Sequence, residues 1–290
     1  MDERERTLIA GRFAPSPTGP LHMGSLVTAL ASYCSVKQAG GQWLVRIDDL
    51  DPPRQDPNAE NAIIRSLAAH GLNSDRPIIF QSDHAVAYES ALQKLTPHLF
   101  YCKCSRRELR AHDRYPGTCR AAKTPTPDRA VRVLMLDAEH DYTDGFLGQV
   151  AADFATQLGD FIVKRRDGLI AYNLATAVDD GDTISEVLRG QDLLPVTAPQ
   201  RYLMQLLGLN VPNYTHIPCL EFNDGTKLSK QSHAPPLDDA CALTNLRAAL
   251  GYLGFRAPDP INSISSLLNW SIQHFDLTQI PDKLPKYRPC

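Results

Sequence analysis

The sequence predicts an α/β protein built on a parallel sheet, and two observations lead to this class. Residues 7–50 alternate between apolar runs of strand length and one run with helical spacing, which is the pattern of a β-α-β unit. A second apolar segment that ends in carboxylates begins at residue 172. Because a β-α-β unit joins parallel strands, we expect ligands to bind beyond the carboxyl ends of these strands.

The elements of the first half follow from apolar runs and from the residues that end them. Gly40 and Gly41 close the first helix, while Asn58 opens the second helix and Gly71 closes it. The second strand runs into residues 48–54, which bring three carboxylates and one arginine to the rim of the sheet. We expect strands at 8–13, 43–47 and 78–80, and helices at 25–38, 58–71 and 88–95.

The later elements are expected from the same patterns. An Asp167-Gly168 turn separates two short strands within 161–172. Pro199 suits the start of a helix at 198–207. A further strand is expected at 131–136, and helices at 240–253 and 261–275. We therefore predict a catalytic domain at 1–80 and 171–222, an insertion at 81–170 and a short helical domain at 223–290.

Composition is that of an ordinary globular protein, with 43% apolar residues, 22% charged residues and a net charge of -3. A globally basic surface for nucleic acid is excluded, so any such surface must be local. The chain has no apolar run of membrane-spanning length, and its N-terminus is charged, so we expect a cytoplasmic protein without a membrane partner. The seven cysteines are therefore expected to be thiols or metal ligands.

The loop between the first strand and the first helix is typical of a phosphate site. It runs from Pro15 to Ser25, and the amide dipoles of the helix N-terminus behind it favour anions. Gly19 and Gly24 allow the backbone to approach a ligand closely, and His22 can donate a hydrogen bond to a phosphate oxygen. The alternative is a Pro- and Gly-rich turn before a surface helix.

A second candidate for phosphate binding lies about 200 residues later, at Lys227-Leu228-Ser229-Lys230. Two lysines around a small hydroxyl residue, after a glycine turn, suit a loop that stabilises charge during nucleotidyl transfer. The alternative is an ordinary solvated loop. Together, in this order and about 200 residues apart, the two segments become a specific signal for a site of phosphoryl or nucleotidyl transfer.

The segment 102–123 combines cysteines with positive charge. It holds seven Lys and Arg residues against Glu108 and Asp113, which suits nucleic-acid phosphates, although a solvated face is the alternative. Cys102, Cys104 and Cys119 provide three thiols for a zinc site, which normally takes four ligands. From residue types alone the fourth ligand is Tyr115 or His112, and the alternative is three reduced cysteines without metal. We expect the remaining cysteines to be plain thiols: Cys34, Cys219, Cys241 and Cys290.

These motifs resemble those of a known family. His22-Met23-Gly24-Ser25 is similar to the HIGH motif of class I aminoacyl-tRNA synthetases, and residues 227–231, Lys-Leu-Ser-Lys-Gln, are similar to their KMSKS motif. Residues 12–19, 48–51 and 172–180 resemble the glutamyl branch of that class. The chain departs from the pattern in two places, because Ser25 replaces the final histidine and Asp48 stands where the branch usually has Glu.

The resemblance implies a Rossmann-like (HUP-type) nucleotide-binding domain with a zinc-bearing insertion, and it implies roles for single residues. It places His22 and Lys230 as catalytic residues. It assigns glutamate binding to Arg12, Phe13, Ala14, Pro15, Ser16, Asp48, Tyr172 and Arg189. It assigns ATP, which enters with Mg²⁺, to His22, Gly24, Ser25, Lys227, Ser229 and Lys230. It assigns one structural zinc per chain to Cys102, Cys104, Tyr115 and Cys119. The alternatives are a surface helix for Arg189 and core packing for Tyr172.

Only about 60 residues follow Gln231, which we expect to be too few for an anticodon-binding region. The layout resembles the truncated members of the glutamyl branch. These activate L-glutamate with ATP in the absence of tRNA and attach it to the queuosine base in the anticodon of tRNA(Asp). We therefore expect ATP, glutamate and queuosine-containing tRNA(Asp) as partners of a monomer. The rival hypotheses are a full glutamyl-tRNA synthetase that charges a tRNA 3′ end, a nucleotidyltransferase with a small acceptor, and a non-catalytic RNA-binding protein.

Overall fold

A computed structural model describes residues 9–135, 141–151, 159–230 and 232–288. The chain forms two compact units. Unit 1 consists of Met1–Phe80, Ile184–Asp192 and Asn213–Cys290, and unit 2 of Gln81–Thr183 and Leu193–Pro212. No helix in the described part of the chain has the length and apolar character needed to cross a bilayer.

The described part of unit 1 contains a five-stranded sheet in which every paired strand is parallel. Its order is β10-β9-β1-β2-β3, which confirms the predicted α/β class. The strands are β1 (Ala10–Phe13), β2 (Gln42–Ile47), β3 (Ile79–Phe80), β9 (Glu186–Gly190) and β10 (Asn213–Ile217). The chain leaves β1 toward β2 and later returns on the other side of β1 through β9. A ligand crevice is therefore expected at the carboxyl ends of β1 and β9, where the strand order reverses.

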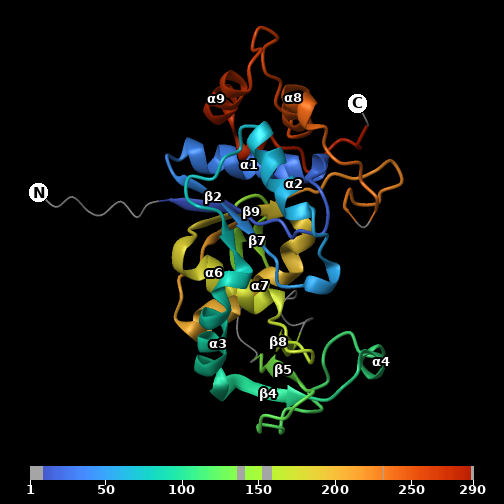
Figure 1. Cartoon of the computed structure of the whole chain (residues 1–290). Coiled ribbons are helices and arrows are strands. Elements are labelled where there is room, and N and C mark those ends of the chain that lie inside the picture. The colour runs from blue at the N-terminus through green and yellow to red at the C-terminus, as the bar shows by residue number, and fades with distance from the viewer. Residues whose placement is uncertain (1–8, 136–140, 152–158, 231, 289–290) are drawn as a thin grey trace, which may run out of the picture. The chain divides into compact units, whose positions relative to one another are not determined.

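Helix α1 (Met23–Gln38) packs against β1, β2 and β9 on one side, while α8 (Ala242–Tyr252) and α9 (Ile264–His274) lie over its other side (Figure 1). Because both sides are covered, α1 is apolar nearly all round, and Leu26, Leu30 and Cys34 are fully buried. Burial raises the pKa of the Cys34 thiol, as expected for a plain core cysteine. Unit 1 also holds α2 (Ala59–Ala69).

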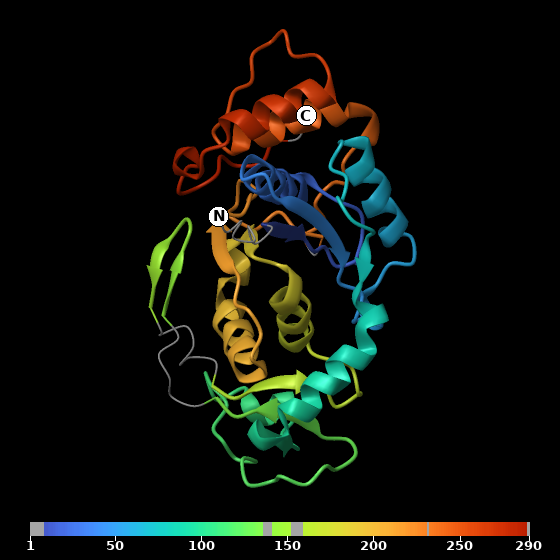
Figure 2. The same cartoon turned by 90° about the vertical axis from the view of Figure 1, so that its left-hand side faces the viewer.

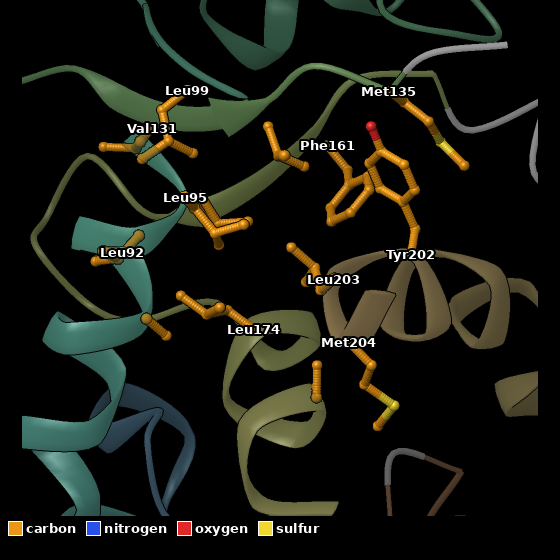
Figure 3. Packing of buried hydrophobic residues seen from close by; sticks show 14 of the residues in the cluster. Leu92, Leu95, Leu99, Val131, Met135, Phe161, Leu174, Tyr202, Leu203 and Met204 are labelled. Atoms are coloured by element: carbon orange, nitrogen blue, oxygen red, sulfur yellow. The ribbon is translucent and has the colours of Figure 1, made fainter. Parts of the chain in front are cut away.

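Unit 2 packs a small antiparallel sheet against helices. The sheet has the order β4-β5-β8, formed by β4 (Leu99–Cys102), β5 (Ala130–Val133) and β8 (Phe161–Lys164). Helices α6 (Tyr172–Thr183) and α7 (Leu194–Leu207) lie side by side, and the sheet crosses one end of them (Figure 2). Figure 3 shows the core between them, where strand side chains meet α3 (Ala85–Lys94), α6 and α7. Unit 2 further contains α4 (Arg106–Leu109) and the hairpin of β6 (Tyr142–Asp144) and β7 (Gly148–Val150).

Short 3₁₀ turns connect several elements of both units. They are η1 (Pro52–Arg54), η2 (Gln81–His84), η3 (Thr96–His98), η4 (Gln191–Leu193), η5 (Asp239–Cys241) and η6 (Leu277–Gln279).

Several sequence expectations need correction, among them the start of helix α3, which lies three residues before the predicted position, and that of α9, which lies three residues after it. The strand expected after Asp167-Gly168 is only a single bridge between Lys164 and Ile170, because the chain enters α6 two residues later. Helix α7 begins four residues before the predicted start, so Pro195 occupies its first turn and Pro199 lies inside it. Helix α1 begins at Met23 rather than Ser25. The expected strand residues Leu8 and Leu136 lie outside the described part of the chain.

Candidate active site and metal site

The loop after β1 ends in a histidine that caps α1. The Nδ1 atom of His22 accepts a hydrogen bond from the backbone N–H of Ser25 at 3.2 Å. The neutral ring must therefore carry its proton on Nε2, which leaves that N–H available to a ligand. Burial, and then the charges of Lys230 and Lys227, lower the pKa of His22 to about 4. At neutral pH the imidazole is a neutral donor beside a helix N-terminus.

The loop that carries Lys227 and Lys230, called the lysine loop below, contacts the N-terminal end of α1. A Cβ on Gly24 would lie 3.2 Å from the His22 ring and 3.4 Å from the carbonyl oxygen of Leu228, so a side chain here would require the His22 ring to move by a few tenths of an ångström. The Lys230 stem lies against Gly19, and its Nζ donates to the carbonyl oxygen of Ser16 at 2.8 Å. Two motifs about 200 residues apart in the sequence are therefore in contact. Burial lowers the pKa of Lys230 to about 8, with Asp56 partly opposing the shift.

The lysine loop is held by a hydrogen bond to residue 220 and by hydrogen bonds within the loop itself. Leu228 is buried and donates its N–H to the carbonyl oxygen of Leu220 at 2.8 Å. The hydroxyl of Ser232 accepts the Ser229 N–H at 2.9 Å and donates to the Lys227 carbonyl at 2.7 Å. Sequence reasoning missed Ser232. The available signal was the presence of two serines close together in a loop, where a serine hydroxyl can form a hydrogen bond with the backbone of a turn. Gln231 lies outside the described residues.

The Lys227 ammonium contacts the carboxylate of Asp192, which sequence reasoning also missed. Asp192 comes two residues after β9 ends. A carboxylate beyond the carboxyl end of a parallel strand was the signal that could have identified it.

A pocket of about 380 Å³ opens beside Lys230 in unit 1. Its lining is Ser16, Pro17, Thr18, Asp48, Asp51, Arg54, Gln55 and Lys230. Three of the predicted site residues share this pocket, namely Ser16, Asp48 and Lys230. The segment 51–55 was recognised only as a charged rim. Its Asp51 carboxylate forms an ion pair with Arg54 at the mouth of this pocket.

Asp48 is paired with an arginine that sequence reasoning missed. The Nε atom of Arg46 donates to Asp48 Oδ1 at 2.7 Å and Nη2 donates to Oδ2 at 3.4 Å. Each side chain is only 4% exposed, so the pair is buried. Asp48 directly follows β2, and its spacing of two residues from Arg46 puts both side chains on the same face of the extended chain, which was the available signal. The Asp48 N–H also donates to the Pro15 carbonyl at 3.0 Å, which ties the backbone of Asp48 to the loop between β1 and α1.

Arg12 and Arg189 lie on the neighbouring strands β1 and β9, and both are buried. Arg189 donates from Nε to Nε2 of His216 at 3.0 Å, and its guanidinium lies 5.1 Å from the ring centroid of Tyr214. The alternative that Arg189 is a surface helix cation is therefore wrong. His216 and Tyr214, two residues apart on β10, are supports that sequence reasoning missed.

The remaining residues that were predicted to bind the substrate glutamate differ in their exposure to solvent. Phe13 is buried and stacks on Trp43 with ring centroids 6.3 Å apart. Ala14 and Pro15 are half-buried in the loop. Tyr172 is the first residue of α6 in unit 2 and is 38% exposed, so the alternative that it packs in a core is wrong.

The three cysteines of unit 2 form a compact cluster. The Sγ atoms of Cys102, Cys104 and Cys119 all lie within 4.8 Å of one another, so they could hold a metal ion. The Tyr115 hydroxyl accepts from Cys102 Sγ at 3.3 Å and from the Cys119 N–H at 2.9 Å. His112, the alternative fourth ligand, is exposed and outside this cluster in the described part of the chain.

The thiols of this cluster differ in acidity. Burial raises the pKa of Cys104 to about 11. Burial would also raise the pKa of Cys119, but hydrogen bonds, the largest from Tyr115, lower it to about 7. One thiolate is therefore accessible near neutral pH, which is the form that binds metals.

The basic residues around the cluster divide into two groups. Arg120 makes two hydrogen bonds to the buried Asp160 carboxylate at 2.7 and 3.0 Å, and Lys123 donates to the Leu99 carbonyl at 3.1 Å. These two therefore stabilise the fold. All seven residues are exposed, and the other five are Lys103, Arg106, Arg107, Arg110 and Arg114.

Known proteins share the sequence pattern and the fold of this chain. The family described as tRNA synthetases class I (E and Q), catalytic domain, matches residues 8–135 and 122–240. A glutamate tRNA ligase structure from Elizabethkingia meningosepticum superposes with a TM-score of 0.78 at 24% identity, over 97% of this chain and 67% of that chain. The glutamate-tRNA synthetase of Elizabethkingia anophelis gives the same TM-score over 68% of its chain. These structures support the fold.

Closer relatives narrow the family. The glutamyl-Q tRNA(Asp) synthetase of Methylococcus capsulatus is 43% identical over 279 residues, covering 93% of this chain and 92% of the relative. The proteins of the same name from Pseudomonas fluorescens and Cronobacter sakazakii are 41% and 42% identical, over 94% and 93% of this chain and 94% and 93% of their own lengths. The chain belongs to the class I tRNA synthetases of the E and Q type, and within them to the glutamyl-Q tRNA(Asp) synthetase family.

Proposed function

We propose that this protein activates L-glutamate with ATP, without tRNA, and transfers the glutamyl group to the queuosine base in the anticodon of tRNA(Asp). The observation that carries the first step is the contact between the two phosphate motifs, where Leu228 reaches Gly24 and Lys230 reaches Ser16. The relatives named glutamyl-Q tRNA(Asp) synthetase support the choice of amino acid and acceptor.

In the first step a glutamate carboxylate oxygen attacks the α-phosphorus of ATP, which forms glutamyl-adenylate and releases pyrophosphate. No protein nucleophile is needed, because catalysis consists of positioning and charge stabilisation. His22 donates from Nε2 to a phosphate oxygen, and Lys230 stabilises the charge that develops on the leaving pyrophosphate. The ATP set also includes the backbone of Gly24 and Ser25, with Lys227 and Ser229 from the lysine loop. Mg²⁺ enters with ATP and is held mainly by phosphates and water.

The charges around the loop fit a glutamate substrate. Guanidinium groups are suited to carboxylates, and Arg12 and Arg189 are held on neighbouring strands. Asp48 provides an anion for the substrate ammonium, while Arg46 fixes its orientation. The loop residues 13–16 belong to the same proposed glutamate site in unit 1, while a role for Tyr172, which lies in unit 2, stays a prediction. In the second step a hydroxyl of the queuosine cyclopentene ring attacks the adenylate carbonyl and releases AMP.

The cysteine cluster is proposed to hold one structural zinc, with Cys102, Cys104, Tyr115 and Cys119 as ligands. Two thiolates bound to one zinc at about 2.3 Å lie about 3.8 Å apart in a tetrahedron. The Sγ atoms of Cys104 and Cys119 are 3.7 Å apart, which fits this requirement. The exposed basic residues nearby are proposed to contact tRNA phosphates.

The test is ATP–pyrophosphate exchange with glutamate, run with and without tRNA, followed by transfer of labelled glutamate to tRNA(Asp) with and without queuosine. We expect exchange without tRNA, and transfer only to the queuosine-containing tRNA. Exchange that requires tRNA, or a product that is esterified at the tRNA 3′ end, would favour a full glutamyl-tRNA synthetase instead. Exchange that does not depend on glutamate would refute the amino acid assignment.

A further inference from the structure

The carboxylate of Asp192 is held from several sides at the end of β9. Its Oδ2 contacts the ammonium of Lys227, and its Oδ1 accepts a hydrogen bond from the thiol of Cys219 at 3.0 Å. Gly190 forms another side, because a Cβ there would lie 2.5 Å from Asp192 Oδ1 and 2.9 Å from Cys219 Sγ. A side chain at residue 190 would therefore force the carboxylate and the thiol to shift from these positions.

This carboxylate is charged. Burial would raise the pKa of Asp192, but hydrogen bonds from Lys227 and Cys219 outweigh burial and lower it. A charged carboxylate that is itself held in place restricts the rotamers of the lysine side chain that it binds. Without such a partner, a long lysine side chain populates many rotamers. The backbone of Lys227 is also fixed, since its carbonyl accepts the Ser232 hydroxyl at 2.7 Å.

The ammonium of Lys227 lies close enough to the N-terminus of α1 for its charge to affect His22. The charge of Lys227 is one of the causes that lower the pKa of His22, so its field reaches the cap of α1. A lysine ammonium has three donors, and its contact with Asp192 uses one of them. The others remain for phosphate oxygens that bind at the α1 N-terminus.

We propose that Asp192 is a positioning residue for the nucleotide, which aims the Lys227 ammonium at the bound triphosphate while Cys219 and Gly190 keep its carboxylate in place. This inference rests on the proposed role of Lys227 with ATP. It adds a requirement for Asp192 to the proposed role of the lysine loop. The loop provides the positive charge of Lys227, and the carboxylate after β9 orients the ammonium that carries this charge.

The test is a double-mutant cycle read as kcat/KM for ATP in pyrophosphate exchange. Asp192→Asn keeps the shape of the side chain but removes its charge, and we expect a loss of about tenfold. The same substitution in a Lys227→Met background should cause no further loss, because there is no ammonium left to aim. A merely structural role would lower the melting temperature and reduce activity equally in both backgrounds.

The matched control is Glu221→Gln. Glu221 forms an ion pair with Lys286 at 2.6 Å, and its backbone forms a bridge with that of Lys227. The substitution therefore removes the charge of a nearby carboxylate that binds a lysine, and it leaves the contact between Asp192 and Lys227 intact. We expect its kcat/KM to stay at the wild-type value. If Asp192→Asn does not fold, Cys219→Ala removes only the brace on Oδ1, and we expect a loss of about threefold that is absent in the Lys227→Met background.

Calorimetric titration with ATP alone gives the second readout. We expect Asp192→Asn to weaken ATP binding several-fold, and to have no effect in the Lys227→Met background. Tighter ATP binding by Asp192→Asn, or equal losses in both backgrounds, would overturn the inference. A wild-type protein that binds ATP with this coupling but shows no glutamate-dependent exchange would refute the proposed function and leave the positioning role supported.

Discussion

The pH dependence of ATP use should be set by Lys230. Its Nζ donates to the carbonyl oxygen of Ser16, and burial lowers its pKa to about 8. Loss of the proton as the pH rises removes the positive charge that stabilises the phosphates, so activity must fall on the alkaline side. We expect kcat/KM for ATP to be the sensitive parameter, because it reports ionisation in the free enzyme.

The magnitude follows from the pKa. A group titrating near 8 is about 90% protonated at pH 7 and about 10% protonated at pH 9, so kcat/KM should fall about tenfold over this interval. His22 adds no acid limb near neutrality, because its pKa is lowered to about 4. A logarithmic plot of kcat/KM against pH should therefore be flat from about pH 6 to 7, bend near pH 8 and approach a slope of minus one above about pH 9.

The assay is pyrophosphate exchange from pH 6 to 10 for the wild-type protein and for Lys230→Arg. Arginine stays protonated over this range, so the limb near pH 8 should disappear even if the variant is slower overall. The amino group of glutamate titrates at higher pH and contributes a limb that both proteins share. A wild-type profile that is flat through pH 9, or an unchanged limb in Lys230→Arg, would refute the reasoning.

Three further outcomes are expected. Gly24→Ala should lower kcat/KM for ATP about tenfold with an unchanged fold, because its methyl group would lie 3.2 Å from the His22 ring; exchange kinetics and circular dichroism measure this. Arg46→Met should lower the free energy of unfolding by about 3 kcal/mol, measured in urea, because the buried Asp48 carboxylate loses two hydrogen bonds. Cys104→Ser should reduce bound zinc well below one ion per chain, measured by elemental analysis.

Each of these changes has a matched control. Gly251→Ala alters a helical glycine with open space around its Cβ position, so it should leave ATP kinetics unchanged. Lys286→Met breaks an exposed ion pair and should cost less than about 1 kcal/mol. Cys241→Ser changes an exposed thiol of unit 1 and should keep the zinc content. An effect as large in a control as in its partner would contradict the corresponding argument.

Much of the fold was predictable from short-range patterns. The strands β1, β2 and β3 and helices α1 and α2 were expected within a few residues of their observed bounds, because apolar periodicity and glycine or asparagine boundaries are local signals. The second strand expected after Gly168 and the start of α7 were wrong. At these places the neighbouring elements decide whether an apolar run pairs as a strand or continues as a helix.

The site was predictable as a set of residue types. His22, Gly24 and the two lysines were predicted to bind phosphate, because such a site needs a hydrogen-bond donor, close approach of the backbone and positive charge, and these roles stay predictions. Arg46 and Asp192 were not recognised, since a charged residue in a strand or after one has many uses. Their importance depends on burial and on partners that the primary sequence does not specify.

The sequence by itself therefore determined the class of the sheet, the residue types of the loop between β1 and α1, and the presence of three clustered thiols. Only the tertiary structure decided that Lys230 contacts Ser16, 214 positions away, while Lys227 contacts Asp192, 35 positions away. The physical reason is that local propensity acts over a few residues, whereas these contacts exist only because β9 pairs with β1 and the lysine loop packs on the end of α1.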